Sequence, residues 1–190
     1  MGEKKRAGIA FTGSYCTYKR VISAVEALAA ELELIPIFSD NSARTDSRFG
    51  KAEDFIKKLE QITGNTAILS IADAEPIGPK KMLDVLVIAP CTGNTIAKLA
   101  NGIADTTVTL AAKSHLRNNR PVVIAVSTND GLSGNAANIG KLMARKNIYM
   151  VPFGQDDFVE KENSIIADFD KILPTVKKAL EGKQLQPILF

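Results

Sequence analysis

The chain has 190 residues, of which 45% are hydrophobic and 24% are charged, and its formal net charge is +3 at pH 7. This composition is typical of a globular protein, and the length favours one domain, residues 1–190, with a sizeable core. The small net charge gives no support for nucleic-acid binding, and no apolar run approaches the length of a membrane span.

Apolar patterns predict an alternation of strands and helices along the chain. Short apolar runs predict strands, which cover residues 7–11, 34–38, 67–71, 85–89, 121–126 and 148–151. Apolar residues at helical spacing predict helices, which cover residues 18–32, 52–62, 96–100, 105–118, 139–143 and 165–180. Strands that alternate with helices imply right-handed crossovers between parallel strands. We therefore predict an α/β fold, a single three-layer α/β/α Rossmann-like domain with a mainly parallel sheet.

The segments between these elements are predicted to be irregular. Residues 39–48 are almost wholly polar and are expected to form a solvated loop. Residues 73–81 contain two prolines and a glycine and are also expected to form a loop. The last helix should be interrupted, or should restart, at Pro174. The tail, residues 186–190, is apolar and is expected to dock on this chain or on a partner.

The stretch from the fourth predicted strand to the next helix is the centre of the predicted sheet. Residues 85–89 are five consecutive apolar residues, which is typical of a strand buried on both faces. Pro90 has no N–H to donate, so we expect it to end the strand. Residues 92–95, Thr-Gly-Asn-Thr, then form a polar turn that can cap the next helix or bind a ligand.

Polar turns follow several of the predicted strands. They comprise residues 13–15, 92–95 and 127–130, and Ser39 adds a fourth polar position. In open parallel sheets, ligands bind at the carboxyl ends of the strands, and a helix N-terminus there can hold a phosphate. The first turn has neither the G-x-G-x-x-G nor the P-loop sequence, so a dinucleotide in its usual pose is disfavoured. A mononucleotide with one phosphate remains open.

Groups for acid–base or redox chemistry are scarce. The single histidine, His115, falls in the last turn of a predicted helix, where it is expected to pack or to interact with the helix dipole. Cys16 and Cys91 are expected to be free thiols, and no cysteine or histidine cluster indicates a metal site. Reduced thiols, and the lack of a signal-peptide core after Met1, predict a cytoplasmic protein. The polar turns suit a phosphorylated cofactor better than hydrolysis.

Three motifs in the polar turns occur in the order found in a known family. Residues 12–14 are Thr-Gly-Ser, residues 89–95 are Ala-Pro-Cys-Thr-Gly-Asn-Thr, and Thr128-Asn129 follows the fifth predicted strand. They resemble motifs of the flavoprotein family that includes flavin-dependent cysteine decarboxylases and flavin prenyltransferases, and the resemblance implies FMN as the ligand. The implied cofactor-binding residues are Gly13, Ser14, Tyr15, Ser39, Thr92, Gly93, Asn94 and Thr95.

Longer stretches resemble one branch of this family, found in spore-forming bacteria. They are residues 74–81, 129–132 and 183–187. The resemblance implies an oxidoreductase subunit that acts with a separate A subunit, which carries a nicotinamide-binding domain, in the oxidation of a cyclic dicarboxylate. It also implies the mother cell of a sporulating bacterium as the location and a homo-oligomer built from trimers.

A dicarboxylate substrate calls for basic and amide groups near the polar turns. An arginine can bind a carboxylate with two hydrogen bonds. The substrate-binding candidates are therefore Asn129, Arg44 and Arg48, with Lys80 and Lys81 as further basic residues.

The position of the family's catalytic histidine separates this chain from the decarboxylases. That histidine falls on Pro76, and proline cannot act as an acid or a base. Decarboxylase chemistry is therefore not expected, although a decarboxylase relative stays an alternative. A non-catalytic scaffold or binding subunit of the same complex is the other alternative.

Overall fold

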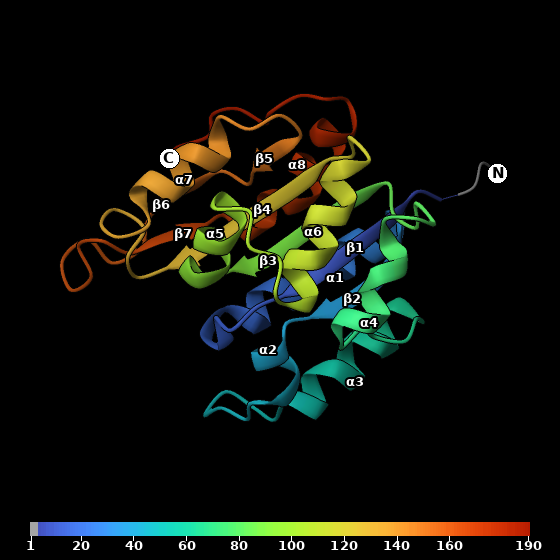
Figure 1. Cartoon of the computed structure of the whole chain (residues 1–190). Coiled ribbons are helices and arrows are strands. Elements are labelled where there is room, and N and C mark those ends of the chain that lie inside the picture. Colours follow the sequence, from blue (N-terminus) through green and yellow to red (C-terminus); the bar gives the residue numbers. More distant parts are fainter. Residues whose placement is uncertain (1–3) are drawn as a thin grey trace.

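The computed structural model describes residues 4–190 as an α/β fold in three layers (Figure 1). The strands are β1 (Arg6–Phe11), β2 (Glu33–Phe38), β3 (Val85–Cys91), β4 (Val122–Thr128), β5 (Ile148–Met150), β6 (Phe153–Gln155) and β7 (Ile165–Ala167). The α-helices are α1 (Tyr18–Glu31), α2 (Asp40–Arg44), α3 (Ala52–Thr63), α4 (Ile71–Ala74), α5 (Gly93–Ala100), α6 (Thr107–Arg117), α7 (Ala136–Met143) and α8 (Ile172–Leu180). Three short 3-10 helices are η1 (Tyr15–Thr17), η2 (Glu75–Ile77) and η3 (Phe169–Lys171). None of the helices between residues 4 and 190 has both the length and the apolar character of a membrane span.

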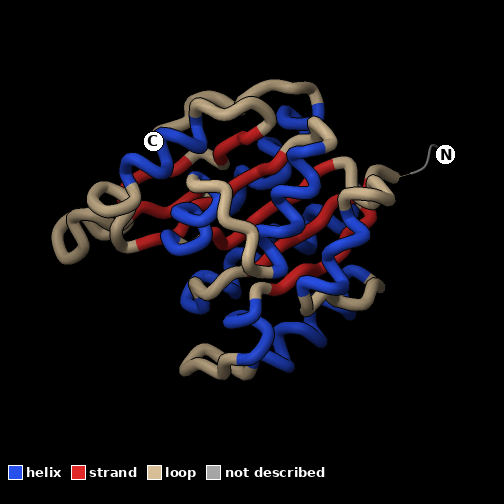
Figure 2. The backbone as a smooth tube through the Cα atoms, viewed as in Figure 1, coloured by secondary structure: helices blue, strands red, loops and turns tan. Residues whose placement is uncertain are grey.

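The sheet has seven strands. Six of them have the order β2-β1-β3-β4-β7-β6, and β5 pairs with β4 outside this order. Strands β1 to β5 are parallel to one another, whereas β7 is antiparallel to both β4 and β6. Helices α1 and α8 contact each other on one face, and α5 contacts α6 and α7 on the other (Figures 1 and 2). The predicted fold class, three layers around a mainly parallel sheet, is confirmed.

Burial explains why the central strand is uniformly apolar. Every residue of β3 is buried, because helices cover both faces of the sheet. Helix α1 places one apolar stripe on the sheet, and its Val21, Val25 and Leu28 are fully buried. Each such side chain contributes about 1.5–3 kcal/mol relative to an exposed one.

Two local predictions between β2 and β3 are wrong. Residues 67–71 do not form a strand, since Ile68 alone pairs, through an isolated bridge to Ile37 of β2. The chain then turns into α4, because the Ser70 hydroxyl accepts a hydrogen bond from the Asp73 N–H at 3.1 Å and caps the helix. The segments predicted as loops contain short helices, α2 within residues 39–48 and α4 with η2 around residues 71–77.

Pro90 does not end the central strand as expected. Strand β3 continues to Cys91, and the pairing with β4 shifts register between Ile88 and Cys91. Because the ladder is already irregular there, the missing N–H of Pro90 interrupts no regular pairing. Strand β4 also extends further than predicted and ends at Thr128.

The last third of the chain contains an antiparallel pair that the sequence pattern did not predict. Residues Ile165–Ala167 form β7 rather than the start of a helix, because they pair with β4 and β6. Pro174 lies in the first turn of α8, where the missing N–H needs no partner. The tail docks on this chain, since the Phe153 N–H donates to the Ile188 carbonyl at 3.0 Å.

The single histidine is part of the interior. His115 has 1% of its surface exposed, and its Nε2 lies 3.1 Å from the carbonyl oxygen of Pro121, the residue just before β4. Burial lowers the pKa of His115 to about 4, and the Pro121 carbonyl opposes this effect only in part. The imidazole is therefore neutral in the folded chain at neutral pH, as expected for a packed residue.

We predict that His115 makes the fold sensitive to mild acid. The unfolded chain binds this proton near the ordinary histidine pKa of about 6.5, whereas the folded chain binds it only near pH 4, so stability falls as the pH drops between these values. The loss attributable to His115 should reach up to about 3 kcal/mol, measured by urea unfolding at several pH values. The variant H115Q keeps an N–H donor without titrating, and should show a shallower decline. An identical decline in both proteins would contradict this account.

Candidate functional site

One buried hydroxyl connects the ends of β1 and β3. Thr12 Oγ1 donates to the Pro90 carbonyl at 2.7 Å and accepts the Thr92 N–H at 3.0 Å, and Thr12 is 1% exposed. The Tyr18 hydroxyl donates to the Thr12 carbonyl at 3.0 Å. These bonds fix the loops that follow the two strands side by side.

The loop after β1 presents unpartnered backbone donors. The N–H groups of Ser14 and Thr17 donate to carbonyls within the loop. Those of Gly13, Tyr15 and Cys16 have no hydrogen-bond partner in the part of the chain that the structure describes. Neighbouring free N–H groups in a turn form a concave site that favours an anion.

The segment after β2 is held against this loop. Ser39 donates its N–H to the Phe11 carbonyl at 3.0 Å, and its hydroxyl accepts the Ser42 N–H at 3.3 Å as the cap of α2. The Tyr15 hydroxyl donates to the Asn41 carbonyl at 2.9 Å. Ser39 therefore lies at the carboxyl edge of the sheet, as predicted, but its hydroxyl is already used to cap α2.

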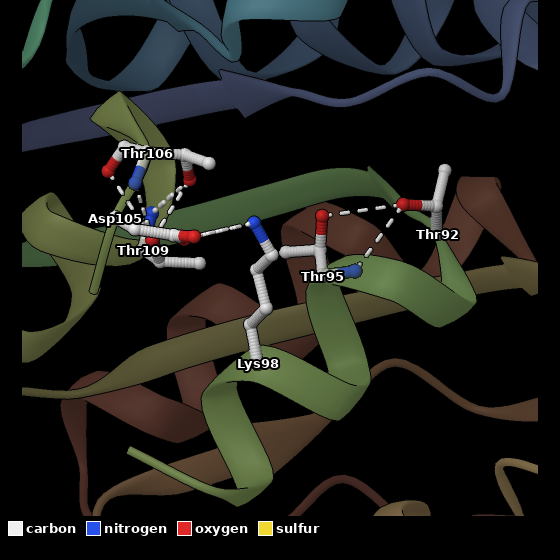
Figure 3. Close-up of polar contacts among 6 residues, drawn as sticks. All are labelled: Thr92, Thr95, Lys98, Asp105, Thr106 and Thr109. Atoms are coloured by element: carbon white, nitrogen blue, oxygen red, sulfur yellow. Dashed lines mark hydrogen bonds and ion pairs between the residues drawn. The ribbon is translucent and has the colours of Figure 1, made fainter. Parts of the chain in front are cut away.

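The remaining turns complete the edge. The Thr92 hydroxyl caps α5 by accepting the Thr95 N–H at 3.5 Å, and the two hydroxyl oxygens lie 3.2 Å apart (Figure 3). The hydroxyls of Ser14 and Ser127 lie 2.8 Å apart and connect the first loop to the end of β4. The turns after β1, β3 and β4 thus form one hydrogen-bonded surface.

Gly93 has no side chain, so α5 can lie close to a network of polar side chains at and after the end of β4. The Thr128 hydroxyl donates to the Asp130 carboxylate, whose other oxygen accepts Asn135 Nδ2 at 2.7 Å. A Cβ at Gly93 would lie 2.5 Å from Thr128 Oγ1 and 2.6 Å from both Asp130 Oδ1 and Asn135 Nδ2. Gly93 therefore supports the site through packing and lines neither of its cavities.

Two adjoining cavities open at this edge, and they share Gly13 and Thr92. Their volumes are about 530 Å³ and 330 Å³, which is the size range of small-molecule sites. Of the residues predicted from the sequence, the larger cavity is lined by Gly13, Ser14, Tyr15, Arg48, Thr92 and Asn129. The smaller cavity is lined by Gly13, Ser39, Thr92, Asn94 and Thr95.

The smaller cavity contains a cation that the sequence analysis missed. Lys98 lines it, and its Nζ donates to both carboxylate oxygens of Asp105, at 2.8 and 3.0 Å (Figure 3). The hydrogen bond from Lys98 lowers the pKa of Asp105. Because Asn94 and Lys98 are four residues apart on α5, helical spacing could have placed them on one face.

The larger cavity carries two cations and an apolar wall. Arg48 and Lys161 line it, with the Arg48 guanidinium 4.9 Å from the ring centre of Phe49 and Lys161 Nζ 3.6 Å from Asp156. Ile165 and Ile166 of β7 supply apolar surface. This wall was not predicted, because the apolar spacing of the β7 residues also fits a helix.

Several predicted residues lie away from the cavities. Arg44 is exposed at the end of α2 and lines neither of them. Lys81 accepts a hydrogen bond at its carbonyl from Arg120, which precedes β4, so Lys80 and Lys81 lie at the amino edge of the sheet. Pro76, within η2, lies in the same region beside α6.

Both cysteines are free thiols, as predicted. Cys91 is fully buried, and burial raises the pKa of its thiol. Cys16 is exposed and lines the larger cavity. Among the residues described, no group of three or more histidine, cysteine or carboxylate side chains is arranged to hold a metal ion.

Comparisons with known proteins agree on one family. A family model described as Flavoprotein matches residues 1–181. The chain is 50% identical over 186 residues to the B subunit of dipicolinate synthase from Bacillus subtilis, covering 97% of this chain and 93% of the relative.

Solved structures of similar proteins superpose on nearly the whole chain. The crystal structure of the dipicolinate synthase B subunit from Bacillus halodurans superposes with a TM-score of 0.91 at 43% identity, covering 99% of this chain and 97% of that one. The FMN-binding protein AtHal3 superposes with a TM-score of 0.65 at 20% identity, covering 92% and 96%, and shares the fold.

We predict that Gly93 tolerates no side chain. The variant G93A should lower the free energy of unfolding by about 1–3 kcal/mol, because its Cβ would push Thr128, Asp130 and Asn135 apart. Urea unfolding measures this change. The control is G134A, whose Cβ would meet Asp130 Oδ2 at an ordinary 3.7 Å. Equal stability of G93A and G134A would refute the packing role.

Proposed function

Because the chain belongs to the Flavoprotein family, we propose that it binds FMN in the two adjoining cavities at the carboxyl edge of its sheet. The observation that carries the proposal is the pair of features at that edge: unpartnered N–H groups, and a cavity with both polar and apolar walls. We also propose that residues 1–190 form one flavoprotein-like domain, which the continuous hydrophobic core supports.

The phosphate is proposed to lie at the border of the cavities, near Gly13, Ser14 and Ser39. Gly13 lines both cavities, and the free N–H groups of Gly13, Tyr15 and Cys16 suit an anion. Each exposed contact between an anion and a helix N-terminus contributes only about 0.3–1 kcal/mol of stabilisation, so several such contacts must act together to bind the phosphate.

The larger cavity is proposed to hold the flavin ring. Tyr15, Phe49, Ile165 and Ile166 supply apolar surface there, and hydroxyl and amide groups supply polar contacts. Thr92, Asn94 and Thr95, with Gly93 behind them, would border the remainder of the cofactor in the smaller cavity.

The proposed role is that of an oxidoreductase subunit acting with the A subunit of a dipicolinate synthase. Support comes from the 50% identity to the B subunit of that enzyme over nearly the whole chain. The proposed reaction is the oxidation of dihydrodipicolinate to dipicolinate, and bound FMN would supply a two-electron acceptor for it. Arg48 and Lys161 would bind the substrate carboxylates, and Asn129 would orient the ring beside them.

The remaining proposals concern where the protein works and with what partners. We propose a cytoplasmic location in the mother cell of a sporulating bacterium, and a homo-oligomer based on trimers. A non-catalytic scaffold is less well supported, because a scaffold needs no cavity with cations at the carboxyl edge. A decarboxylase is disfavoured because Pro76 stands at the sequence position of the family's catalytic histidine, and the single histidine, His115, is buried and lines neither cavity.

FMN binding is the first prediction from this proposal. Titration of the protein into FMN should quench the flavin fluorescence, and FMN at 100 times its Kd should raise the free energy of unfolding by about 2.7 kcal/mol. The variant N94D places a negative charge on an exposed residue of the smaller cavity, and should weaken FMN binding by at least roughly tenfold.

The control for this titration is N119D. Asn119 is exposed in the turn before β4, at the amino edge, so the same charge change should leave FMN affinity unaltered. No response to FMN at high micromolar concentration, from a folded protein, would refute the cofactor proposal.

Substrate binding is the second prediction. In an assay of the chain mixed with the A subunit, R48Q should lower kcat/KM by roughly 10- to 100-fold, because a charge-assisted hydrogen bond to the substrate is lost. The matched variant R44Q removes the same charge from outside the cavities and should retain full activity. If the A subunit alone were as active as the mixture, the scaffold alternative would replace this proposal.

A further inference from the structure

A third cavity lies on the face of the sheet that α5, α6 and α7 cover, outside the proposed flavin site (Figure 1). Its volume is about 400 Å³, which is within the range of small-molecule sites. It shares no lining residue with the two cavities at the carboxyl edge. Leu99, Ile103 and Leu116 form its apolar lining, and Ile103 is 47% exposed. An open apolar lining of this size favours a ligand that contains an apolar ring.

We call this space the basic cavity, because three cations line it. Lys113 and Arg117 are one turn apart on α6, and Arg145 follows α7. None of these three side chains forms an ion pair with a carboxylate in the part of the chain that the structure describes. Arg145 Nη1 donates to the Leu99 carbonyl at 3.0 Å, which holds the guanidinium at the cavity. The three charges are therefore available to an anionic ligand.

The cations come from two sides of the apolar lining. Helix α6 supplies Lys113 and Arg117, the segment after α7 supplies Arg145, and α5 contacts both helices. Like charges one turn apart on a helix repel each other, and a bound anion would remove this repulsion. An arginine can bind a carboxylate with two hydrogen bonds. The cavity thus fits a ligand with two carboxylates and an apolar ring between them.

We propose that the basic cavity binds a small ring compound that carries two carboxylates. One carboxylate would bind Lys113 and Arg117, the other would bind Arg145, and the ring would pack on Leu99 and Leu116. The ligand binds reversibly as a dianion, and no covalent bond forms or breaks. An inorganic dianion would make the charge contacts without burying a ring, so it should bind more weakly.

The product of the proposed reaction belongs to this class of ligand, an assignment that rests on the proposed function. Dipicolinate is a flat pyridine ring with two carboxylates. Because the basic cavity shares no lining residue with the flavin-site cavities, dipicolinate can bind there while FMN occupies the carboxyl edge. The protein would then hold its product at a second site, away from the reacting ring.

Equilibrium dialysis of the FMN-free full chain against pyridine-2,6-dicarboxylate tests this site, in buffer without divalent cations. The variant R48Q/K161Q is the background, because it removes the two cations of the larger flavin-site cavity, where the same ligand is proposed to bind as product. This background should bind one equivalent of the ligand. Adding K113Q/R117Q, or R145Q, should weaken the binding by at least roughly tenfold, because hydrogen bonds between charged groups are lost.

Matched variants and ligands control for charge and chemistry. In the same background, K19Q/K80Q removes two exposed lysines that line none of the three cavities, and should leave the affinity unchanged. Benzene-1,3-dicarboxylate lacks the ring nitrogen but has the same carboxylate geometry, and should bind with similar affinity. Sulfate and pyridine each lack one half of the ligand, and should bind at least roughly tenfold more weakly.

Three results would overturn the proposal: no binding to the background chain, binding that K113Q/R117Q and R145Q leave unchanged, or an equal loss in K19Q/K80Q. Sulfate bound as tightly as the ring dicarboxylates would overturn the assigned ligand class. Circular dichroism of each variant checks that the fold is intact. FMN titration of the wild-type chain is independent of these measurements. If the dicarboxylate results follow the prediction and FMN does not bind, the flavin proposal alone fails, and the reverse outcome removes only the basic cavity.

Discussion

The hydroxyl of Thr12 is the interaction on which the architecture of the site depends. It uses its donor on the Pro90 carbonyl and accepts the Thr92 N–H, so one buried side chain joins the ends of β1 and β3. Loss of either bond would leave a buried polar group without a partner, which costs about 1–3 kcal/mol. The same group sets the distance between the free N–H groups after β1 and the cap of α5. Binding surface and fold stability therefore rest on the same contacts.

The site spans the border between two kinds of sheet. Its first walls follow the parallel strands β1, β2 and β3, where a sheet of this type ordinarily binds ligands. Its last wall comes from β7, which is antiparallel to β4 and begins just after the exposed loop. The first walls are thus fixed by the core, whereas the last wall depends on β7 and on the loop before it, in which the N–H groups of Lys161 and Ser164 donate to the carbonyls of Asp157 and Lys161 at 2.8 and 2.9 Å.

The sequence predicted the parts of the structure that follow from long apolar patterns. The five parallel strands, the helices between most of them and the convergence of the polar turns all follow from buried runs and from sheet geometry. The three-residue strands β6 and β7 were not predictable in this way, because Ile165 and Ile166 fit a helical stripe equally well and only pairing with β4 distinguishes the two. Lys98 was missed although its spacing of four residues from Asn94 places both side chains on one face of α5. The role of Gly93 depends on close contact with residues far along the chain.

The central claim is that the loops joined by Thr12 form one flavin site. Hydrogen–deuterium exchange of the chain with and without FMN tests it directly, because free N–H groups that bind a phosphate become protected. The account predicts protection of the free amides of Gly13, Tyr15 and Cys16, and unchanged exchange at residues 78–82 on the amino edge. Protection confined to the amino edge, with none at residues 13–17, would contradict it.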